Sequence, residues 1–203
     1  MKRLLITAAL AALLVGPAAA ETRNLRGFDA VGASDQIRVE ITVGGDYSVE
    51  VVGRDAARVL TEVDDGTLTI RQRNRPWFGS NHLDATVRIR MPELESVAAA
   101  RGVELTATGV DAISFEIAAA MGAEVRVSGT CRTLEAAAAM GATIRADELL
   151  CETADVAASM GGTAQVYASQ TYEGAASMGG TINISGDGAS RGESTAMGGT
   201  IND

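Results

Sequence analysis

Aromatic residues are scarce in this chain, and so is the side chain on which enzymes most often rely for proton transfer. Phe, Trp and Tyr make up 3% of the sequence although 46% of it is hydrophobic, so any core must be aliphatic. Histidine occurs once, as His82, in a stretch with Pro, Trp, Gly and Asn. A Ser-His-Asp arrangement could be built only around His82, and a solvated loop histidine is the simpler interpretation.

Long apolar runs are lacking after the first residues, so the sequence predicts no transmembrane segment. At the start, two basic residues and an apolar run over 4–15, too short to span a bilayer, are followed by three alanines. This pattern predicts a signal peptide over residues 1–20, cleaved after Ala20. We expect a periplasmic or secreted protein, without a lipid anchor because no cysteine follows the cut.

Basic residues are in the minority. Removing residues 1–20 takes away two of the 17 basic groups and none of the 26 acidic groups, which leaves a net charge of −11. A charge of this sign argues against binding to nucleic acid or to an anionic membrane surface. The remaining chain is long enough for one domain or two small ones.

The second half of the sequence contains a short internal repeat. From residue 118 the chain spells AAAMGAEV, AAAMGATI, AASMGGTA, AASMGGTI and STAMGGTI, and AAARGVEL precedes these copies with Arg101 in the methionine place. The Met-Gly pairs are Met121-Gly122, Met140-Gly141, Met160-Gly161, Met178-Gly179 and Met197-Gly198, at intervals of 19, 20, 18 and 19 residues. Such a period predicts one solenoid coil per repeat, each burying its apolar face against its neighbours.

The coils are predicted to be β-strands. A period near 20 residues is too short for helical repeats, and the leucine-rich consensus with its asparagine is absent. Alternating runs such as Val125-Arg126-Val127 and Ile182-Asn183-Ile184 are typical of strands. We therefore predict an all-β protein with a parallel β-helix of about 19 residues per coil over residues 94–203.

Stacked coils turn each repeat position into a ladder of like side chains. An apolar or small residue lies four after each methionine, and even spacing places both in the core if the glycine leaves the alternation intact. The small residue before each methionine then points outward, as does a threonine ladder. In chain order the three predicted ladders contain Val125, Ile144, Ala164, Ile182 and Ile201 in the core, Ala120, Ala139, Ser159, Ser177 and Ala196 outside, and Thr143, Thr163, Thr181 and Thr200 outside.

Residues 21–93 show strands without the repeat. Alternating apolar residues over 37–43 and 47–51 flank a Gly-Gly-Asp turn and predict a hairpin, and further strands are expected before Pro92. We interpret this region as an N-terminal β cap or head, because terminal repeats must be atypical to shield the end of a solenoid.

The segments GFDAVGASDQIRVEIT, YSVEV, DDGTLTI and VRIRMPELESV, together with the small-Gly repeats, resemble the head GIN domain family of auto-transporter adhesins. The resemblance covers residues 25–203. It implies an exported bacterial protein with a β-helical fold, expected to be right-handed. The family label suggests adhesion, and the resemblance supplies no catalytic residues.

Cys131 and Cys151 are separated by 20 residues, the same interval as Met140 to Met160, so they occupy the same place in adjacent coils. Two thiols one strand apart lie within the Cα range of a disulfide, and an oxidising compartment favours the bond over two free thiols. Both states remain open at this point.

Metal sites find little support in the sequence. Segment 185–188, Ser-Gly-Asp-Gly, has the composition of a calcium loop but lacks the repeated pattern of calcium-binding solenoids. The methionine ladder could hold a soft ion such as Cu(I), yet packing in the core is the simpler role for it. Asp111, Asp147, Asp155 and Asp187 fall at different phases of the coil, and we expect no carboxylate ladder. The sequence thus predicts neither a metal nor a cofactor.

Segment 71–79 is the best surface candidate for a ligand. It places Arg73 and Arg75 beside Trp77 and Phe78 in an otherwise acidic protein. Arginine and aromatic side chains together suit anionic groups and sugars. Alternatively, the two aromatics fold over the open end of the solenoid as a lid.

We predict from these features a non-enzymatic binding, adhesion-like or structural protein of the cell envelope. Its ligand, a protein or a polysaccharide, is not identified by the sequence. The alternatives are a carbohydrate-active enzyme, for which coils of 18 to 20 residues leave no room for cleft walls, and a flat-face surface binder. The last coil stops in repeat pattern, so we expect two chains to pair end to end there, or the N-terminal segment to cover it.

Overall fold

The computed structural model describes residues 20–73 and 83–203. Within these ranges it is built of strands and one three-residue 3-10 helix, η1 (Ala56–Arg58), which confirms the all-β class. The strands are β1 (Glu21–Arg23), β2 (Ala30–Ser34), β3 (Arg38–Val43), β4 (Ser48–Val52), β5 (Val59–Asp64), β6 (Thr67–Gln72), β7 (Thr86–Met91), β8 (Ser96–Ala100), β9 (Glu104–Ala120), β10 (Glu124–Ala139), β11 (Thr143–Ser159), β12 (Thr163–Ser177), β13 (Thr181–Ser185), β14 (Ala189–Ala196) and β15 (Thr200–Asn202).

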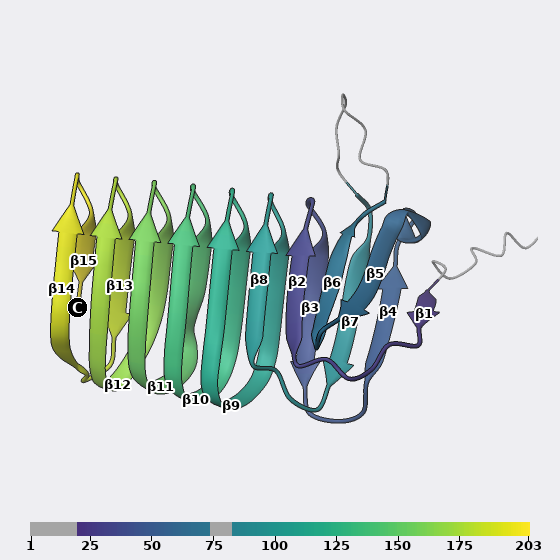
Figure 1. Ribbon diagram of the computed structural model, residues 1–203, viewed down its shortest axis with the longest axis horizontal. Coiled ribbons are helices and arrows are strands. Elements are labelled where there is room, and N and C mark those ends of the chain that lie inside the picture. The colour runs from purple at the N-terminus through teal and green to yellow at the C-terminus, as the bar shows by residue number, and fades with distance from the viewer. Residues whose placement is uncertain (1–19, 74–82) are drawn as a thin grey trace, which may run out of the picture.

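Parallel pairing of successive strands builds a flattened solenoid with two faces (Figure 1). The long strands β9 to β12 bend halfway, so their first halves lie on one face and their last halves on the other. We call the first face the threonine face; it also contains β3, β7, β13 and β15. The second, the alanine face, also contains β2, β6, β8 and β14. The predicted parallel solenoid is confirmed.

Each Met-Gly pair forms a tight turn between the two faces. The methionines have φ between 46° and 54° and the glycines that follow them between 71° and 78°. The residue after the glycine donates its N–H to the carbonyl before the methionine, as from Gly162 to Ser159 at 2.9 Å. Two positive φ values inside such a bond define a type I′ turn. We call the edge formed by these turns the turn edge, and the opposite one the bend edge.

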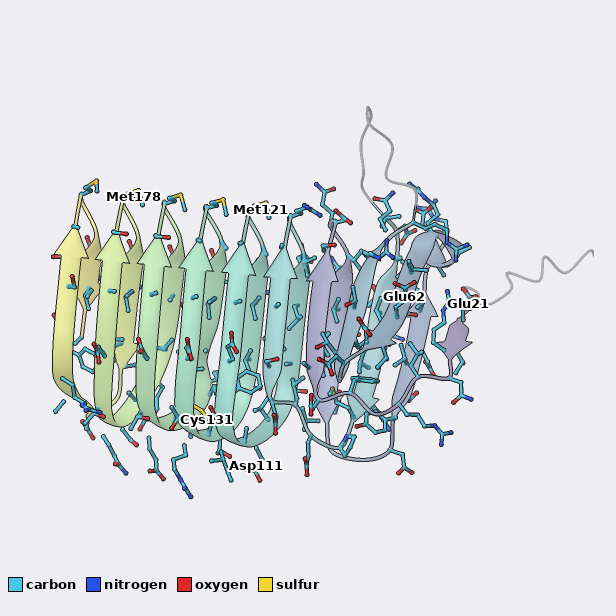
Figure 2. The ribbon with its side chains drawn as sticks, viewed as in Figure 1. Glu21, Glu62, Asp111, Met121, Cys131 and Met178 are labelled. Atoms are coloured by element: carbon cyan, nitrogen blue, oxygen red, sulfur yellow. A yellow bond between two sulfur atoms is a disulfide. The ribbon has the colours of Figure 1, made fainter. Side chains whose placement is uncertain are left out.

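The methionines do not point into the core, and the sequence prediction on this point was wrong. Met121, Met140, Met160 and Met178 are 43–47% exposed and Met197 is 78% exposed. Figure 2 shows the labelled Met121 and Met178 projecting outward at the turn edge. Two consecutive positive φ values interrupt the alternation of a strand, so the side of the methionine cannot be inferred by counting to the residue four positions later.

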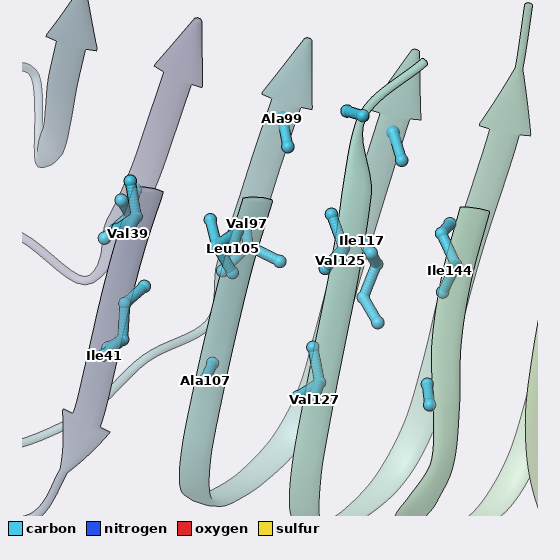
Figure 3. Close-up of a cluster of buried hydrophobic side chains, with 14 of the residues drawn as sticks. Val39, Ile41, Val97, Ala99, Leu105, Ala107, Ile117, Val125, Val127 and Ile144 are labelled. Atoms are coloured by element: carbon cyan, nitrogen blue, oxygen red, sulfur yellow. The ribbon is translucent and has the colours of Figure 1, made fainter. Parts of the chain in front are cut away.

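The core is a narrow aliphatic layer between the two faces. Side chains such as Val125, Ile144 and Ile117 point into it and are fully buried (Figure 3). The strand register places the predicted core ladder from Val125 to Ile201 and the threonine ladder from Thr143 to Thr200 in line. Both ladders are thus confirmed. The other buried side chains are mostly aliphatic or small, with a few aromatics and the polar Gln72 and Asp35 as exceptions.

The stack of parallel strands continues across the boundary at residue 93. β2 and β3 form a coil of their own that pairs with β8 and β9 on one side and with β6 and β7 on the other. Asp35 and Gln36, both at positive φ, form the turn of this coil, and the Gln36 N–H donates to the Arg101 carbonyl. This coil could not be recognised from the repeat pattern, because Gln36 stands in the place of the repeat glycine.

Antiparallel strands close the N-terminal end. β5 pairs with β6, β4 pairs with β7, and β1 adds to β4, all antiparallel. In the same region Phe28 and Tyr47 pack with ring centroids 5.0 Å apart and an interplanar angle of 54°, and the Tyr47 hydroxyl donates to the Phe28 carbonyl at 2.9 Å. This region lies at the far end of the solenoid from β14 and β15 (Figure 1). It therefore does not cover the last coil, contrary to one of the two expectations.

The last coil is polar rather than a bare apolar edge. Opposite the buried Tyr172 and Gly174, strand β14 carries the polar residues Ser190 and Glu193. The buried Tyr172 hydroxyl donates towards the carboxylates of Glu193 at 2.8 Å and Asp203 at 2.9 Å. These contacts tie the final coil to the one before it.

Candidate functional site

Small side chains cover the outer surface of the alanine face in two straight columns. The strand register puts these positions directly in line from coil to coil, at about 4.8 Å per step. One column contains Gly32, Ala98, Ala118, Ala137, Ala157, Ala175 and Ser194, and the other contains Ser34, Ala100, Ala120, Ala139, Ser159, Ser177 and Ala196. A shallow hollow of about 460 Å³ lies over the first coils and is lined mainly by these alanines. The result is a flat apolar strip, as the outward small ladder predicted.

A row of carboxylates borders this strip on the side away from the methionines. Glu116, Glu135, Asp155 and Glu173 pair with one another in register on successive coils. The expectation of no carboxylate ladder was therefore wrong. All four side chains are exposed, and no ion pair joins them to an arginine within residues 20–73 and 83–203. Like charges in line repel by about 1 kcal/mol per neighbouring pair in water, so this row does not serve stability.

Many charges on the threonine face take part in ion pairs. Arg88 bonds to Glu40 at 3.1 Å, Arg38 bonds to Glu104 at 2.9 Å, and Arg126 and Arg145 both contact Glu124. An open groove of about 680 Å³ near Arg88 is lined by further charged and hydroxyl side chains. Ion pairs of this kind partly cancel the charges of their members, which distinguishes this face from the acidic row beside the alanine columns.

The methionine ladder occupies the turn edge, beside the small-residue columns. Between Met121 and Met197, the turns contain only Ala, Ser and Gly besides methionine, so the thioethers have no charged neighbour within the turns. At the N-terminal side the ladder ends at Arg101, whose guanidinium contacts Asp35 at 3.4 Å.

Cys131 and Cys151 lie opposite each other on β10 and β11, near the bend edge. They form a disulfide with Cα atoms 4.5 Å apart. Of the two alternatives left by the sequence, a disulfide or two free thiols, the structure contains the disulfide. Both sulfur atoms are consumed by this bond, and the chain has two cysteines in all.

The ligand loop predicted from the sequence falls largely outside the described residues. Arg75, Trp77, Phe78 and His82 belong to residues 74–82, which the structure does not describe. Arg73 is described; it is exposed just after β6, and its N–H donates to the Arg58 carbonyl at 2.6 Å. The role of this loop stays a prediction.

Over residues 20–73 and 83–203, no helix has the length and hydropathy needed to cross a bilayer. In the same ranges, no group of three or more His, Cys, Asp or Glu side chains is placed to hold a metal ion.

Known proteins resemble this chain mainly through its fold. The solved structures include a putative adhesin from Bacteroides fragilis, with 16% identity, a TM-score of 0.62, and 91% and 95% of the two chains covered. A putative adhesin from Parabacteroides merdae has 12% identity, a TM-score of 0.55, and coverage of 93% and 97%. A putative lipid binding protein from Parabacteroides distasonis has 17% identity, a TM-score of 0.52, and coverage of 93% and 98%. At these identities the likeness establishes the fold alone.

No curated protein matches the sequence. A family model described as "Putative auto-transporter adhesin, head GIN domain" matches residues 27–188, which is most of the chain. The match covers the N-terminal coils, the antiparallel cap except β1, and all but the last part of the repeat. The chain therefore belongs to the head GIN domain family of auto-transporter adhesins.

Proposed function

We propose that this protein is an exported, non-enzymatic binding protein of the cell envelope that attaches to an external protein partner through its alanine face. The observation that carries the proposal is the flat, in-register strip of small side chains with an acidic border that has no ion pair within residues 20–73 and 83–203. Its family, whose description names adhesins, supports a binding role. Export is supported by the predicted signal peptide, since β1 begins at Glu21, directly after the predicted cleavage.

The chemistry of the alanine face indicates the kind of partner. Alanine columns lose little side-chain entropy on contact and fit another flat apolar surface closely. The acidic row adds a requirement for Lys or Arg along one margin of that surface, since complementary charge guides association. A polysaccharide would find neither aromatic platforms nor convergent hydrogen-bond donors on this strip, so a protein with a basic margin fits better.

The same proposal holds that the protein is not an enzyme. Glu116, Glu135, Asp155 and Glu173 stand in an open row on a flat surface, whereas glycosidic cleavage needs two carboxyl groups facing each other across a bound sugar. The carbohydrate-active alternative would require such walls around the substrate.

The proposal is tested by capture of partners from an envelope extract with matched variants. Ala137→Gln with Ala175→Gln roughens the alanine face, and Thr106→Gln with Thr163→Gln makes the same kind of change on the threonine face. We expect the first variant to lose a partner that the wild type and the second variant retain. Glu135→Gln with Asp155→Asn should weaken capture and reduce its dependence on salt. Equal capture by all variants would exclude the alanine face.

The loop at 71–79 provides a second contact candidate that the same extract can test. If it binds the partner, Arg75→Ala with Trp77→Ala should abolish capture at an unchanged melting temperature, because arginine and aromatic anchors dominate interfaces. A large fall in the melting temperature would instead identify the aromatics as a structural lid.

A further inference from the structure

The turn edge places methionine where neither packing nor backbone conformation favours it. The chain has 7 methionines, and five of them occupy the same turn position on successive coils. That position requires a positive φ, which Gly, Asn and Asp adopt more readily than methionine. The side chain gains little burial in return, as the 43–78% exposure shows. A stability role therefore does not account for these five residues.

The repeated element on this edge is the thioether sulfur. Met and the Gly after it stay in all five copies while the positions around them change. The turn accounts for the glycine, whereas apolar bulk at the methionine position could come from any aliphatic residue. Figure 2 shows the side chains of Met121 and Met178 directed away from the solenoid on the same edge. The sulfur atoms thus form a row of soft donors open to solvent.

Strand spacing sets the separation of these donors. Hydrogen bonds from each turn glycine to the methionine carbonyl of the next coil, such as Gly141 to Met160 at 3.1 Å, hold neighbouring turns in register. Parallel coils are about 4.8 Å apart. Two metal–sulfur bonds of about 2.3 Å, the length found in zinc thiolate sites, nearly span that distance end to end. The three rotatable bonds of methionine can supply the remaining adjustment.

We propose that the turn edge binds a soft monovalent ion, Cu(I) in chemical class, between the thioethers of methionines on adjacent coils. Thioether ligands select Cu(I) over hard cations, and the turns offer no carboxylate that would favour Ca²⁺ or Mg²⁺. The competing thiols are removed by the Cys131–Cys151 disulfide. This inference is independent of the proposed partner on the alanine face.

Five sulfur atoms in a row accommodate two ions held by two sulfurs each, with one thioether left over. The test uses Ag(I) as a redox-inert probe in chloride-free buffer. Binding is followed by calorimetry and by the NMR signals of the methionine methyl groups, with the fully buried Met91 as an internal reference. We expect two Ag(I) per wild-type chain and shifted signals for the turn methionines, with Met91 unchanged.

Two variants that each remove two thioethers distinguish paired binding from isolated contacts. Met140→Leu with Met178→Leu leaves no two neighbouring methionines, whereas Met121→Leu with Met197→Leu leaves three in a row. Leucine keeps the apolar bulk of the edge. We expect the first variant to lose tight Ag(I) binding, at least tenfold in affinity, and the second to bind one ion. The proposal is overturned if the wild type binds no Ag(I), if the first variant still binds two ions, or if both variants are weakened equally.

Discussion

Methionine at the turn position tests how far backbone conformation governs this fold. Met160 has a φ of 49°, a backbone conformation that is strained for residues other than Gly, Asn or Asp. Asn-Gly is the preferred pair of a type I′ turn. We therefore expect Met160→Asn to raise the unfolding free energy, by about 0.5–1 kcal/mol. Thermal unfolding measures this, and a lower melting temperature would mean that the methionine contributes packing which its exposure does not reveal.

The two glycines of the Met-Gly-Gly copies are required for different reasons. Gly161 has a φ of 73° and open space around a hypothetical Cβ, so Gly161→Ala should cost about 1 kcal/mol through conformation alone. At Gly162 an added Cβ would lie 2.4 Å from the Ala138 carbonyl oxygen of the preceding coil. Gly162→Ala must displace backbone and should cost clearly more. Chemical denaturation of both variants, with Ser159→Ala on the outer surface as control, measures the loss in unfolding free energy of each. Equal losses for the two glycine variants would contradict the expected difference between them.

The direction in which the methionine side chains point could not be predicted from the alternation of the sequence. The turn consists of a small residue, Met, Gly and the Ala or Gly just before the next strand, and alternation cannot be counted through a turn. The bond from Gly162 to Ser159 across Met160 depends on φ values that alternation does not encode. The glycine after each methionine was the available signal for that turn.

Tyr172 links two coils through a titratable group. Its hydroxyl donates to Glu193 and, with burial and the Asp203 contact, this raises the pKa of Tyr172 to about 12. The folded-state pKa therefore lies above the unfolded value of about 10. Its stabilisation is complete below about pH 10 and is lost as the pH rises towards about 12.

Tyr172→Phe should consequently lower the unfolding free energy at neutral pH, by about 1 kcal/mol. The difference between wild type and variant should shrink between about pH 10 and pH 12, because the wild-type hydroxyl ionises there. Urea unfolding across this pH range measures the difference in unfolding free energy. A difference that does not change with pH would show that the Tyr172 hydroxyl is not its cause.

The disulfide between β10 and β11 closes a loop of one coil. With a sequence separation of 20 residues, we expect Cys131→Ala with Cys151→Ala to lower the unfolding free energy by about 3 kcal/mol. Alanine suits both positions because the two cysteines are buried. Thiol titration of the denatured wild type should find no free thiol; two titratable thiols, with unchanged stability in the variant, would show that the bond does not form.

Ladders of like side chains are the features that this sequence predicts best, provided that Asp and Glu are treated as equivalent when the repeats are aligned. Glu116, Glu135, Asp155 and Glu173 each precede a turn methionine by five residues, so their alignment was present in the repeat. The four aspartates Asp111, Asp147, Asp155 and Asp187 do not reveal this row, because three of its four members are glutamates. The disulfide followed from the same counting, because both cysteines lie at one phase of the coil.

At the scale of the whole molecule, stacking order could not be read from chain order. The coil of β2 and β3 lies between β6–β7 and β8–β9, so the chain passes over its own first coil before the repeat begins. No repeated motif marks β6 or β7, and antiparallel strands β4 and β5 interrupt the progression. Only tertiary pairing reveals that this region continues the solenoid.

The C-terminal edge determines whether two molecules can join end to end. A second copy pairing there would bury the inward positions of β14, which carry Glu193 and Thr195, together with the Asp203 carboxylate beside Tyr172. Burying such charges without new partners is unfavourable, and polar edges are a common means of preventing strand pairing. We therefore expect the wild type to remain monomeric, against the pairing anticipated from the repeat alone.

Making the edge apolar should release that pairing. Glu193→Val with Thr195→Val replaces the two inward polar side chains by apolar ones, like Val156 and Ala158 at the same positions two coils earlier. The exposed Ser194→Val on the outer surface of the same strand serves as control. Two last coils facing each other would pair β14 with its symmetry mate, an isologous contact. Sedimentation at increasing concentration should show dimers of the double variant only. A wild type that dimerises equally would mean that Glu193 does not block the edge, and dimers of the control alone would place the contact on the alanine face.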